Sequence, residues 1–379
     1  MKVTLIGTLP PIKGISPYCQ GLLDALSESV DVEFIGFKEI YPDFLYPGGV
    51  KAGNKESRGF KTKRAKIRNI LTYYNPLSWI WAGLTLTGDV VHGQWWAYPL
   101  APVYFLILLL AKLRGKKVII TTHNTAPHEK NRINNFLNNV ILGMGDLLII
   151  HSEKNRDDLS KRCGIDSKKI FVVPTGILTP APVRGIGRKE ARRYLKIGND
   201  EKILLFFGNI RDYKGLDVLL KSLKSIGEEI TNVRLIVAGQ PWENWRKYER
   251  IIRENGIGDG VIKKLGFIDN SEVEYYFSAS DLVVLPYKYF DSQSGVGAMA
   301  LPFGKPLVVT DVGGLTDFVK DKRAIAKPND PEDLARVIVG ILKDERLINK
   351  LSSDSNELTK KYTWDKIAEE TIELYRGLK

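Results

Sequence analysis

The sequence is poor in cysteine and histidine. Its 379 residues include two cysteines, Cys19 and Cys163, and four histidines. Two cysteines cannot form a disulfide framework, and these two lack the spacing of metal ligands, which indicates a reducing, cytoplasmic setting. So few histidines argue against a site in which several histidines bind a metal.

Long hydrophobic runs are also missing. The longest, residues 99–112, is shorter than the roughly 20 residues that a membrane-spanning helix needs. This run predicts a buried helix, with a helix lying on a membrane surface as the alternative. The N-terminal residues MKVTLIGTLPP soon turn into a proline-rich loop, so they predict a first buried strand and not a signal peptide.

Acidic residues are also few relative to basic ones. The sequence has 56 Lys and Arg and 44 Asp and Glu, which gives a formal net charge of +12. This balance favours nucleotides, nucleic acid or an anionic membrane as partners, unless it reflects only a generally basic surface. The excess peaks in residues 51–68, with eight basic residues and one acid, and aromatic-rich residues 69–83 follow. Such a segment suits an anionic bilayer surface; the alternative is a solvated loop before a core helix.

What the sequence does contain is a regular alternation of strands and helices. Short apolar runs rich in β-branched residues, such as KVTLIG and KKVIITTHN, predict parallel strands covered on both faces. Residues 169–187, rich in proline and glycine, interrupt the alternation, which then restarts. We therefore predict an α/β protein of two Rossmann-like, doubly wound domains, residues 1–175 with 363–379 and residues 176–362.

The loop FFGNIRDYKGLDVLL in the second domain could bind a diphosphate. A strand ends at Gly208, and a helix opens after Gly215. Between them, Arg211 and Lys214 supply positive charge, and arginine can contact two oxygens at once. Two surface cations beside an ordinary turn are the alternative interpretation.

The loop DSQSGVGAMALPFGKP suits the same anion. Ser294, Gly295 and Val296 stand where a helix would begin, and free N–H groups at a helix N-terminus bind anions. Asp291 precedes them and offers a carboxylate to a sugar hydroxyl. We therefore expect backbone donors for a phosphate and one acid beside whatever that phosphate carries.

The first domain offers weaker signals. Gly14 lies in a loop after the first strand, where backbone could approach a ligand closely. His123 ends a buried strand in TTHNT, and we expect it to point toward a ligand. His92 ends another strand and Trp95 follows it, so we expect both to contact an acceptor, because aromatic faces stack on sugars.

These motifs together resemble the retaining glycosyltransferases of family 4, which have the GT-B fold. The similarity spans nearly the whole chain and is strongest over residues 172–314. It rests on VVPTGI, GNIRDYKGLD, RLIVAG, GFIDNSEVEYYFSASDLVVLPY and ALPFGKPLVVTDVGG, which occur in the family's order.

The resemblance implies two domains facing a cleft, with the C-terminal helix returning to the N-terminal domain. It also implies a nucleotide-sugar donor in the second domain, an acceptor in the first, retention of configuration, and neither metal nor cofactor at the site. By this resemblance His123 and Asp291 are the catalytic candidates. The candidates for binding the donor diphosphate are Gly14, Arg211, Lys214, Ser294, Gly295 and Val296.

Two positions depart from the family pattern. Many members carry two glutamates eight positions apart, and the matching residues here are Asp291 and Met299. The second glutamate usually holds the ribose, so the ribose contact must differ or the donor is unconventional. The arginine that usually follows the glycine of the phosphate loop is replaced by Asn209, and Arg211 could substitute for it.

The acceptor is open at this stage. Residues 51–74 and 99–112 favour a lipid-linked or surface glycan, reached by peripheral contact with the cytoplasmic face of an anionic membrane. Two other enzyme classes on a related fold are alternatives, a nucleotide-sugar epimerase and a phosphorylase, although we locate no lysine typical of phosphorylase cofactor chemistry. A basic nucleic-acid-binding protein is the non-enzyme alternative; no recognisable module supports it, so we predict no nucleic-acid partner.

Overall fold

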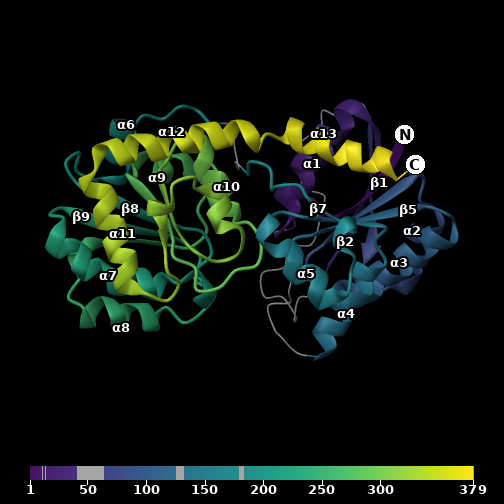
Figure 1. Ribbon diagram of the computed structural model, residues 1–379, viewed down its shortest axis with the longest axis horizontal. Helices are drawn as coiled ribbons and strands as arrows, with labels where there is room; N and C mark the ends of the chain where they lie inside the picture. Colours follow the sequence, from purple (N-terminus) through teal and green to yellow (C-terminus); the bar gives the residue numbers. More distant parts are fainter. Residues whose placement is uncertain (11, 13, 41–63, 125–131, 179–182, 379) are drawn as a thin grey trace. The chain divides into compact units, whose positions relative to one another are not determined.

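The computed structural model describes residues 1–10, 12, 14–40, 64–124, 132–178 and 183–378 (Figure 1). The chain divides into two compact units, Met1–Gly176 with Thr363–Lys379 and Ile177–Tyr362. Each unit contains one sheet in which every strand pairs in parallel with its neighbours. The predicted class, two Rossmann-like α/β domains, is thereby confirmed.

The sheet of the first unit has the order β3-β2-β1-β4-β5-β6-β7. Its strands are β1 Lys2–Gly7, β2 Asp31–Glu39, β3 Ala65–Thr72, β4 Val90–Trp95, β5 Lys117–Thr122, β6 Leu147–Ile150 and β7 Ile170–Val172. The direction of strand order reverses between β1 and β4. In open parallel sheets, ligands bind at the carboxyl ends of the strands beside such a reversal.

The helices of the first unit are α1 Ser16–Ser29, α2 Pro76–Leu84, α3 Ala101–Leu113, α4 Arg132–Gly143, α5 Arg156–Cys163 and α13 Trp364–Gly377. The C-terminal helix α13 packs against α1. Gly21 and Gly176 both lie against the ring of Trp364, which leaves no space for a side chain at either position. The end of the chain thus belongs to the core of this unit.

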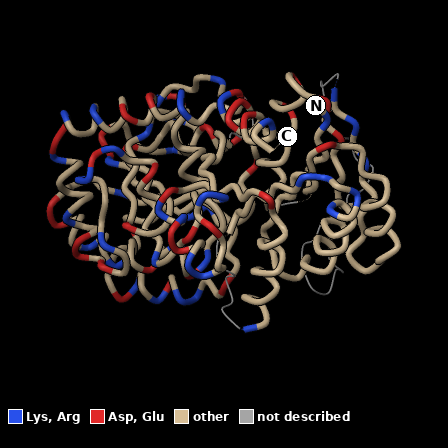
Figure 2. The backbone as a smooth tube through the Cα atoms, turned by 45° about the vertical axis from the view of Figure 1, so that its right-hand side comes forward, with Lys and Arg blue, Asp and Glu red and all other residues tan. Residues whose placement is uncertain are grey.

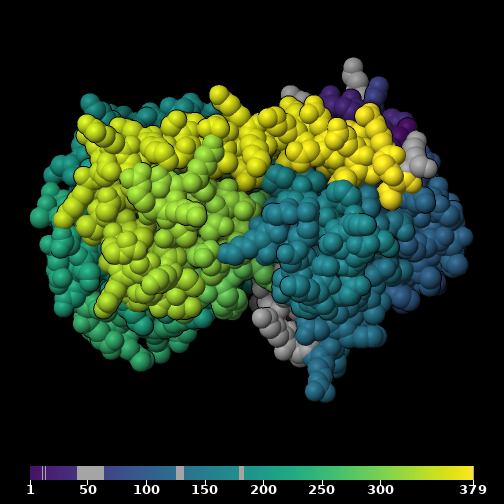
Figure 3. Space-filling model, in the orientation of Figure 1, coloured from purple at the N-terminus to yellow at the C-terminus, as the bar shows by residue number. Residues whose placement is uncertain are grey.

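The sheet of the second unit has the order β10-β9-β8-β11-β12-β13, which reverses between β8 and β11. Its strands are β8 Lys202–Phe207, β9 Val233–Gly239, β10 Val261–Leu265, β11 Leu282–Leu285, β12 Leu307–Thr310 and β13 Ile325–Ala326. Its helices are α6 Arg188–Leu195, α7 Leu216–Glu229, α8 Arg246–Glu254, α9 Val273–Ala279, α10 Gly295–Ala300, α11 Pro331–Lys343 and α12 Glu345–Lys361. The space-filling view shows α11 and α12, in yellow, at the surface of this unit (Figure 3).

The central strands read as unbroken apolar runs because both of their faces are buried. Along β8, Leu204 and Phe206 join one core cluster, whereas Ile203, Leu205 and Phe207 join the other. A strand alternates its side chains between two faces, so a sheet covered by helices on both sides needs apolar residues at every position. This pattern made β8 predictable from the sequence.

Two segments differ from expectation. β3 begins within the basic segment, residues 51–68, which we had interpreted as facing a membrane or as a solvated loop. Arg68 on this strand donates from Nη1 to the Glu33 carboxylate at 2.8 Å. β7 lies within residues 169–187, so the first part of the segment that we expected to interrupt the alternation is itself a strand. Residues 51–63, the larger part of the basic segment, lie outside the described residues.

The apolar run at residues 99–112 forms most of α3, and only one face of this helix is buried. Among the described residues, no helix is long and apolar enough to cross a membrane.

Candidate functional site

The loops that follow β8 and β11 flank the reversal of strand order in the second unit. Gly208 directly follows β8 and has a φ of 95°, which favours glycine. Its carbonyl lies against Gly239, where a side chain would have no space. A side chain added at Gly208 would lie 3.3 Å from Lys214 Nζ and 3.2 Å from a methyl group of Val296. The predicted residues Lys214 and Val296 therefore meet over the same glycine.

Lys214 is a buried cation at the end of a short 3-10 helix, Asp212–Lys214, with 8 % of its surface exposed. Its Nζ lies 5.6 Å from the centre of the Tyr287 ring. Among the described residues, no carboxylate lies within ion-pair distance of this ammonium group. Burial, and secondarily the positive charge of Arg211, lowers the pKa of Lys214 to about 8. An anion bound here would compensate a charge that the described part of the chain leaves uncompensated.

The neighbouring cations differ in what they contact. The guanidinium of Arg211 lies over the ring of Trp242, 4.3 Å from its centre. Lys288 instead pairs with Asp212 at 3.0 Å and with Asp217 at 2.9 Å. Lys288 is thus neutralised by two carboxylates, so we assign it no ligand.

The loop after β11 holds the N-terminus of α10 in place. Ser294 caps this helix, since its Oγ accepts from Gly297 N at 3.3 Å. The same Oγ lies 3.0 Å from the Tyr287 hydroxyl. Thr310 donates from its hydroxyl to the Tyr287 carbonyl at 2.6 Å. The N–H groups of the first turn cannot bond within their own helix, so those of Gly295 and of its neighbours are available to an anion.

Asp291 lies at the start of this loop and is partly exposed. Burial chiefly raises the pKa of the Tyr213 phenol, and the charge of Asp291 adds to that rise, so the two groups are neighbours. The Tyr213 ring stacks on Phe290 with the ring centres 5.8 Å apart. Met299 lies on α10 and packs against the apolar core, so it presents no carboxylate to a ribose.

The corresponding edge of the first unit begins with the loop after β1. Gly14 has a φ of 93°, and no atom lies within 4 Å of the position that its side chain would take. Ser16 donates from its hydroxyl to the Thr8 hydroxyl at 2.9 Å, which closes the loop onto the strand. Pro11 and Lys13 lie outside the described residues. Gly14 thus offers open backbone, as a ligand-binding loop requires.

Three histidines of the first unit form one chain of polar contacts. His123 Nε2 lies 3.0 Å from Gln94 Oε1, and His123 Nδ1 lies 3.2 Å from His151 Nε2. His151 Nδ1 lies 2.9 Å from the Val173 carbonyl and donates to it. At the other end, Gln94 Nε2 lies 3.1 Å from His92 Nε2. Both ring nitrogens of His123 therefore lie within hydrogen-bonding distance of polar groups of the same unit.

Burial keeps these histidines uncharged. It lowers the pKa of His92 to about 3 and that of His151 to about 4. The pKa of His123 is lowered well below its ordinary value by burial and then by the two neighbouring histidines. His151, for which the sequence predicted no role at the site, is a partner of His123.

His92 and Trp95, expected to contact an acceptor, are both buried inside the first unit. His92 is 0 % exposed, and its Nδ1 lies 2.6 Å from the Tyr375 hydroxyl of α13. Trp95 is 1 % exposed, and its Nε1 donates to Asn138 Oδ1 at 2.7 Å. The expectation was wrong because both residues lie within β4, where each face of the sheet is covered. His128 lies outside the described residues.

Gln94 and Tyr287 were not predicted as site residues. Gln94 stands two positions after His92, so the alternation along a strand places their side chains on one face. That spacing could have identified Gln94 as a member of the chain of polar contacts with the histidines. Nothing in the sequence marked the Tyr287 hydroxyl as a partner of the helix cap at Ser294.

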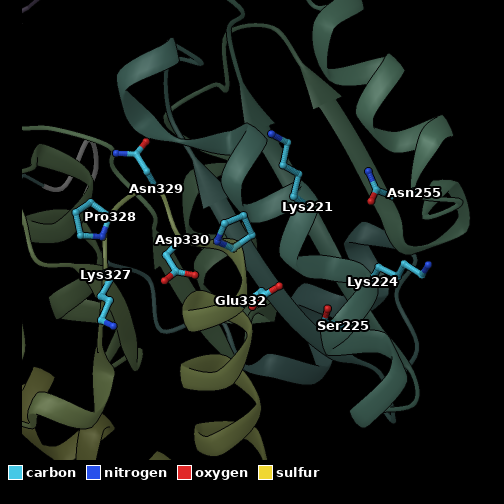
Figure 4. Close-up of a pocket in the computed structure, with 10 residues that line it drawn as sticks. Lys221, Lys224, Ser225, Asn255, Lys327, Pro328, Asn329, Asp330 and Glu332 are labelled. Carbon is cyan, nitrogen blue, oxygen red and sulfur yellow. The ribbon is translucent and has the colours of Figure 1, made fainter.

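One surface pocket of about 610 Å³ lies elsewhere on the second unit, between α7 and the start of α11 (Figure 4). Its lining includes Lys221, Lys224 and Lys327 together with Asp330 and Glu332, and none of the predicted site residues. The three lysines point in different directions (Figure 4). Cations that do not converge and that stand beside two acids do not form an anion site, so we assign the pocket no ligand.

Among the described residues, no group of three or more His, Cys, Asp or Glu side chains is placed to hold a metal ion.

Two consecutive Rossmann-like units, each with a parallel sheet that reverses its strand order, are the architecture of the GT-B class. Two family models match the chain, "Glycosyltransferase Family 4" over residues 12–179 and "Glycosyl transferases group 1" over residues 187–359. The chain belongs to the glycosyltransferases of this group 1, family 4 type.

Curated relatives are similar over part of their length. An uncharacterized glycosyltransferase of Methanocaldococcus jannaschii is 31% identical over 193 residues, which is 49% of this chain and 47% of that protein. A D-inositol 3-phosphate glycosyltransferase of Xylanimonas cellulosilytica is 27% identical over 246 residues, 62% of this chain and 58% of that protein. The chain thus matches about half of the length of these relatives.

Solved structures share the fold over the whole chain. A sucrose-phosphate synthase from Thermosynechococcus elongatus has a TM-score of 0.75 at 19% identity, covering 100% of this chain and 99% of that one. The Anabaena protein HepE in complex with UDP has a TM-score of 0.74 at 15% identity, with 100% of both chains covered.

Proposed function

We propose that this protein transfers a sugar from a nucleoside-diphosphate sugar to an acceptor hydroxyl with retention of anomeric configuration. The observation that carries the proposal is Lys214, a buried ammonium group with no carboxylate partner among the described residues, beside the start of α10. A buried charge is costly unless an opposite charge compensates it. The diphosphate of the donor would supply that charge.

Charge and backbone dipoles favour departure of the diphosphate. As the bond between the anomeric carbon and the phosphate oxygen breaks, negative charge grows on the leaving group. Lys214, Arg211 and the N–H groups at the start of α10 stabilise that charge without rearranging. The acceptor oxygen forms the new bond to the anomeric carbon on the same face, and its proton passes to the departing phosphate.

The other candidates serve the sugar in this proposal. Asp291 accepts a hydrogen bond from a sugar hydroxyl, and the open backbone at Gly14 allows close approach to the donor. His123 contributes as a neutral, fixed ring, since both of its nitrogens are already bonded within the first unit. Met299 leaves the ribose without the carboxylate that related enzymes use.

The acceptor in this proposal is a hydroxyl of a lipid-linked or surface glycan. Some relatives are named D-inositol 3-phosphate glycosyltransferases, so inositol 3-phosphate belongs in the same test as a small soluble acceptor. UDP is the first nucleotide to test because the Anabaena HepE protein was solved with it. ADP and GDP complete the panel.

Two lysines of the second unit, Lys214, which is buried, and Lys305, which is partly buried, provide a matched test. Burial lowers the pKa of both Lys214 and Lys305 to about 8. Lys305, however, donates to the carbonyls of Ser278 and Ser280, each at 3.0 Å. We therefore compare Lys214→Met with Lys305→Met by calorimetric titration with UDP, ADP and GDP and by thermal unfolding.

Lys214→Met should weaken nucleotide binding about ten- to hundredfold, the value of one or two hydrogen bonds to a charged group, and leave the protein at least as stable as before. Lys305→Met should lower the unfolding temperature, because two carbonyls lose their donor, and should bind nucleotide normally. Equal nucleotide affinity in Lys214→Met and wild type would contradict the proposed site. Release of the nucleoside diphosphate only when an acceptor is present would then separate a transferase from an epimerase.

A further inference from the structure

The helix α2 of the first unit is apolar and largely exposed. Its sequence, PLSWIWAGL, contains no charged residue. Leu77 is 74% exposed, Trp81 61% and Leu84 53%, with Ile80 at 38%. These four residues are spaced three or four positions apart, so they form a single stripe along one face.

The helix α3 carries a second stripe. Phe105, Leu109 and Leu113 are exposed and stand four positions apart. The two helices pack on each other where Gly83, lacking a side chain, makes space for Leu110. We call the two stripes together the α2–α3 surface; it consists of Leu77, Ile80, Trp81, Leu84, Phe105, Leu109 and Leu113.

The α2–α3 surface is not needed for the core of the unit. The buried side of α3 is formed by residues such as Val103, Ile107 and Ala111, which already join the core cluster. Exposed apolar patches of this kind on a soluble chain mark interaction sites. Each of these two neighbouring helices therefore packs one side against the core of the first unit and leaves an apolar stripe on its other side exposed to water.

Along residues 73–117, which contain the α2–α3 surface, the charged residues are nearly all basic; of these, Lys112 pairs with Asp146 at 2.9 Å. Between residues 73 and 117 the only acid is Asp89, whereas Lys112, Arg114, Lys116 and Lys117 cluster at the end of α3. α2 contains no charged residue, and α3 contains one, Lys112; Figure 2, which colours charged residues, shows the helices of this part of the first unit mostly in tan. Arg114 donates from Nη1 to the Gly83 carbonyl at 3.0 Å, which fixes this cation at the end of α2.

We propose that the α2–α3 surface docks on an anionic lipid bilayer. The apolar stripes enter the headgroup region, where the Trp81 ring is well suited, and the cations at the end of α3 contact lipid phosphates. Both helices lie in the plane of the interface, since neither is long enough to cross it. A second copy of the chain fits less well, because two basic edges would repel each other.

This inference goes beyond the proposed function and does not depend on the donor site. Binding to a bilayer would place the first unit beside lipid-linked hydroxyls. The vesicle test below uses protein without any nucleotide, and the nucleotide titration above uses no lipid. Failure of one therefore leaves the other intact.

Flotation with vesicles tests the apolar part. Wild-type protein should float with vesicles of phosphatidylcholine and phosphatidylglycerol at low salt, and less with phosphatidylcholine alone or at high salt. The double variant Leu77→Ser, Trp81→Ser should lose about tenfold or more in partitioning. Its matched control is Ile133→Ser, Phe136→Ser on α4, where the side chains are 71% and 66% exposed.

The charge part has its own pair of variants. Lys116→Gln, Lys117→Gln should weaken partitioning about fivefold for each charge, whereas Lys221→Gln, Lys224→Gln on the second unit should change it little. Thermal unfolding and UDP titration of each variant show that the fold and the donor site are intact. Equal losses in test and control variants, or binding that ignores anionic lipid, would overturn the proposal. So would a salt-insensitive dimer, measured without vesicles, that Trp81→Ser converts to monomer, because a second copy would then be the occupant.

Discussion

The two sheets reverse their strand order in the same way, but they hold different groups at that edge. Beside β4 of the first unit, Gln94, His123 and His151 bond to one another. Beside β8 of the second unit, Lys214 is buried without a carboxylate partner among the described residues, next to the first turn of α10. The topology fixes where a ligand can bind, and the side chains decide what charge it must carry.

The difference has a physical consequence for each edge. In the first unit, burial holds the polar groups neutral, so an anion would gain little there beyond ordinary hydrogen bonds. In the second unit, burial acts on a cation, and an arriving anion gains a charge-assisted bond in a site shielded from water. The comparison therefore supports our proposal that the diphosphate binds to the second unit and that the first takes a neutral, hydroxyl-bearing group.

Acid should produce the largest difference between the units. In the unfolded chain histidine takes up a proton below pH of about 6.5, but the folded pKa of His92 is about 3 and that of His151 about 4. In this range of pH the unfolded state binds more protons than the folded state. The contribution of the two neutral histidines to the free energy of unfolding is therefore complete above pH of about 6.5 and is lost as the pH falls toward 4. Within that window, each histidine should lower the free energy of unfolding of the first unit by about 1.4 kcal/mol for each unit by which the pH falls.

Hydrogen exchange at pH 7 and pH 5, analysed by peptide, measures this loss in each unit separately. The second unit, residues 177–362, contains no histidine and serves as the internal control. His151→Asn should reduce the acid sensitivity of the first unit while leaving that of the second unchanged. An equal loss in both units would show that carboxylates, not the buried histidine chain, govern acid unfolding.

A pair of glycines sharpens the comparison by mutation. Gly14 and Gly208 have φ values of 93° and 95°, so alanine should destabilise either unit by about 1–2 kcal/mol through backbone strain alone. At Gly14 the added carbon meets no atom within 4 Å, but at Gly208 it lies 3.3 Å from Lys214 Nζ. Gly208→Ala should therefore also weaken UDP binding several-fold.

Urea unfolding and UDP titration of both variants separate the two effects. Gly14→Ala and Gly208→Ala should lose similar stability, and Gly208→Ala should lose more UDP affinity than Gly14→Ala, beyond the fraction that is unfolded. If Gly14→Ala weakened UDP binding more than Gly208→Ala, the nucleotide would have to be reassigned to the first unit.

The fold could be predicted from the sequence because buried strands leave a strong pattern. KILLFF and VRLIVAG are unbroken apolar runs, and they form β8 and β9 as expected. β3 was missed because Lys66 and Arg68 interrupt its apolar residues, and the ion pair of Arg68 with Glu33 cannot be read from spacing. A charged edge strand satisfies its cations through distant residues, which a local pattern does not reveal.

The site was harder to predict, since a residue's place along a strand does not tell which way its side chain faces. His92 and Trp95 were expected at a ligand because polar and aromatic residues ended an apolar run, yet both are buried in the first unit. Lys214 and Ser294 were named from glycine-rich loops after strands, and the structure brings their loops to one edge. Titration with a nucleoside diphosphate is the direct test of their role.

The pH dependence of nucleotide binding is the smallest effect and the most specific. A diphosphate gains from Lys214 only when the lysine is protonated, and its pKa without ligand is about 8. UDP affinity should therefore change little below pH 8 and should fall up to about tenfold per pH unit above it. Arginine keeps its charge at any such pH, so in Lys214→Arg the fall above pH 8 should disappear even if affinity at pH 7 is lower. Lys305→Met retains Lys214 and should show the same pH dependence of UDP affinity as the wild type. If UDP affinity still fell above pH 8 in Lys214→Arg, a group other than Lys214 would be titrating. The edge of the second unit would then lack the feature that distinguishes it from the edge of the first.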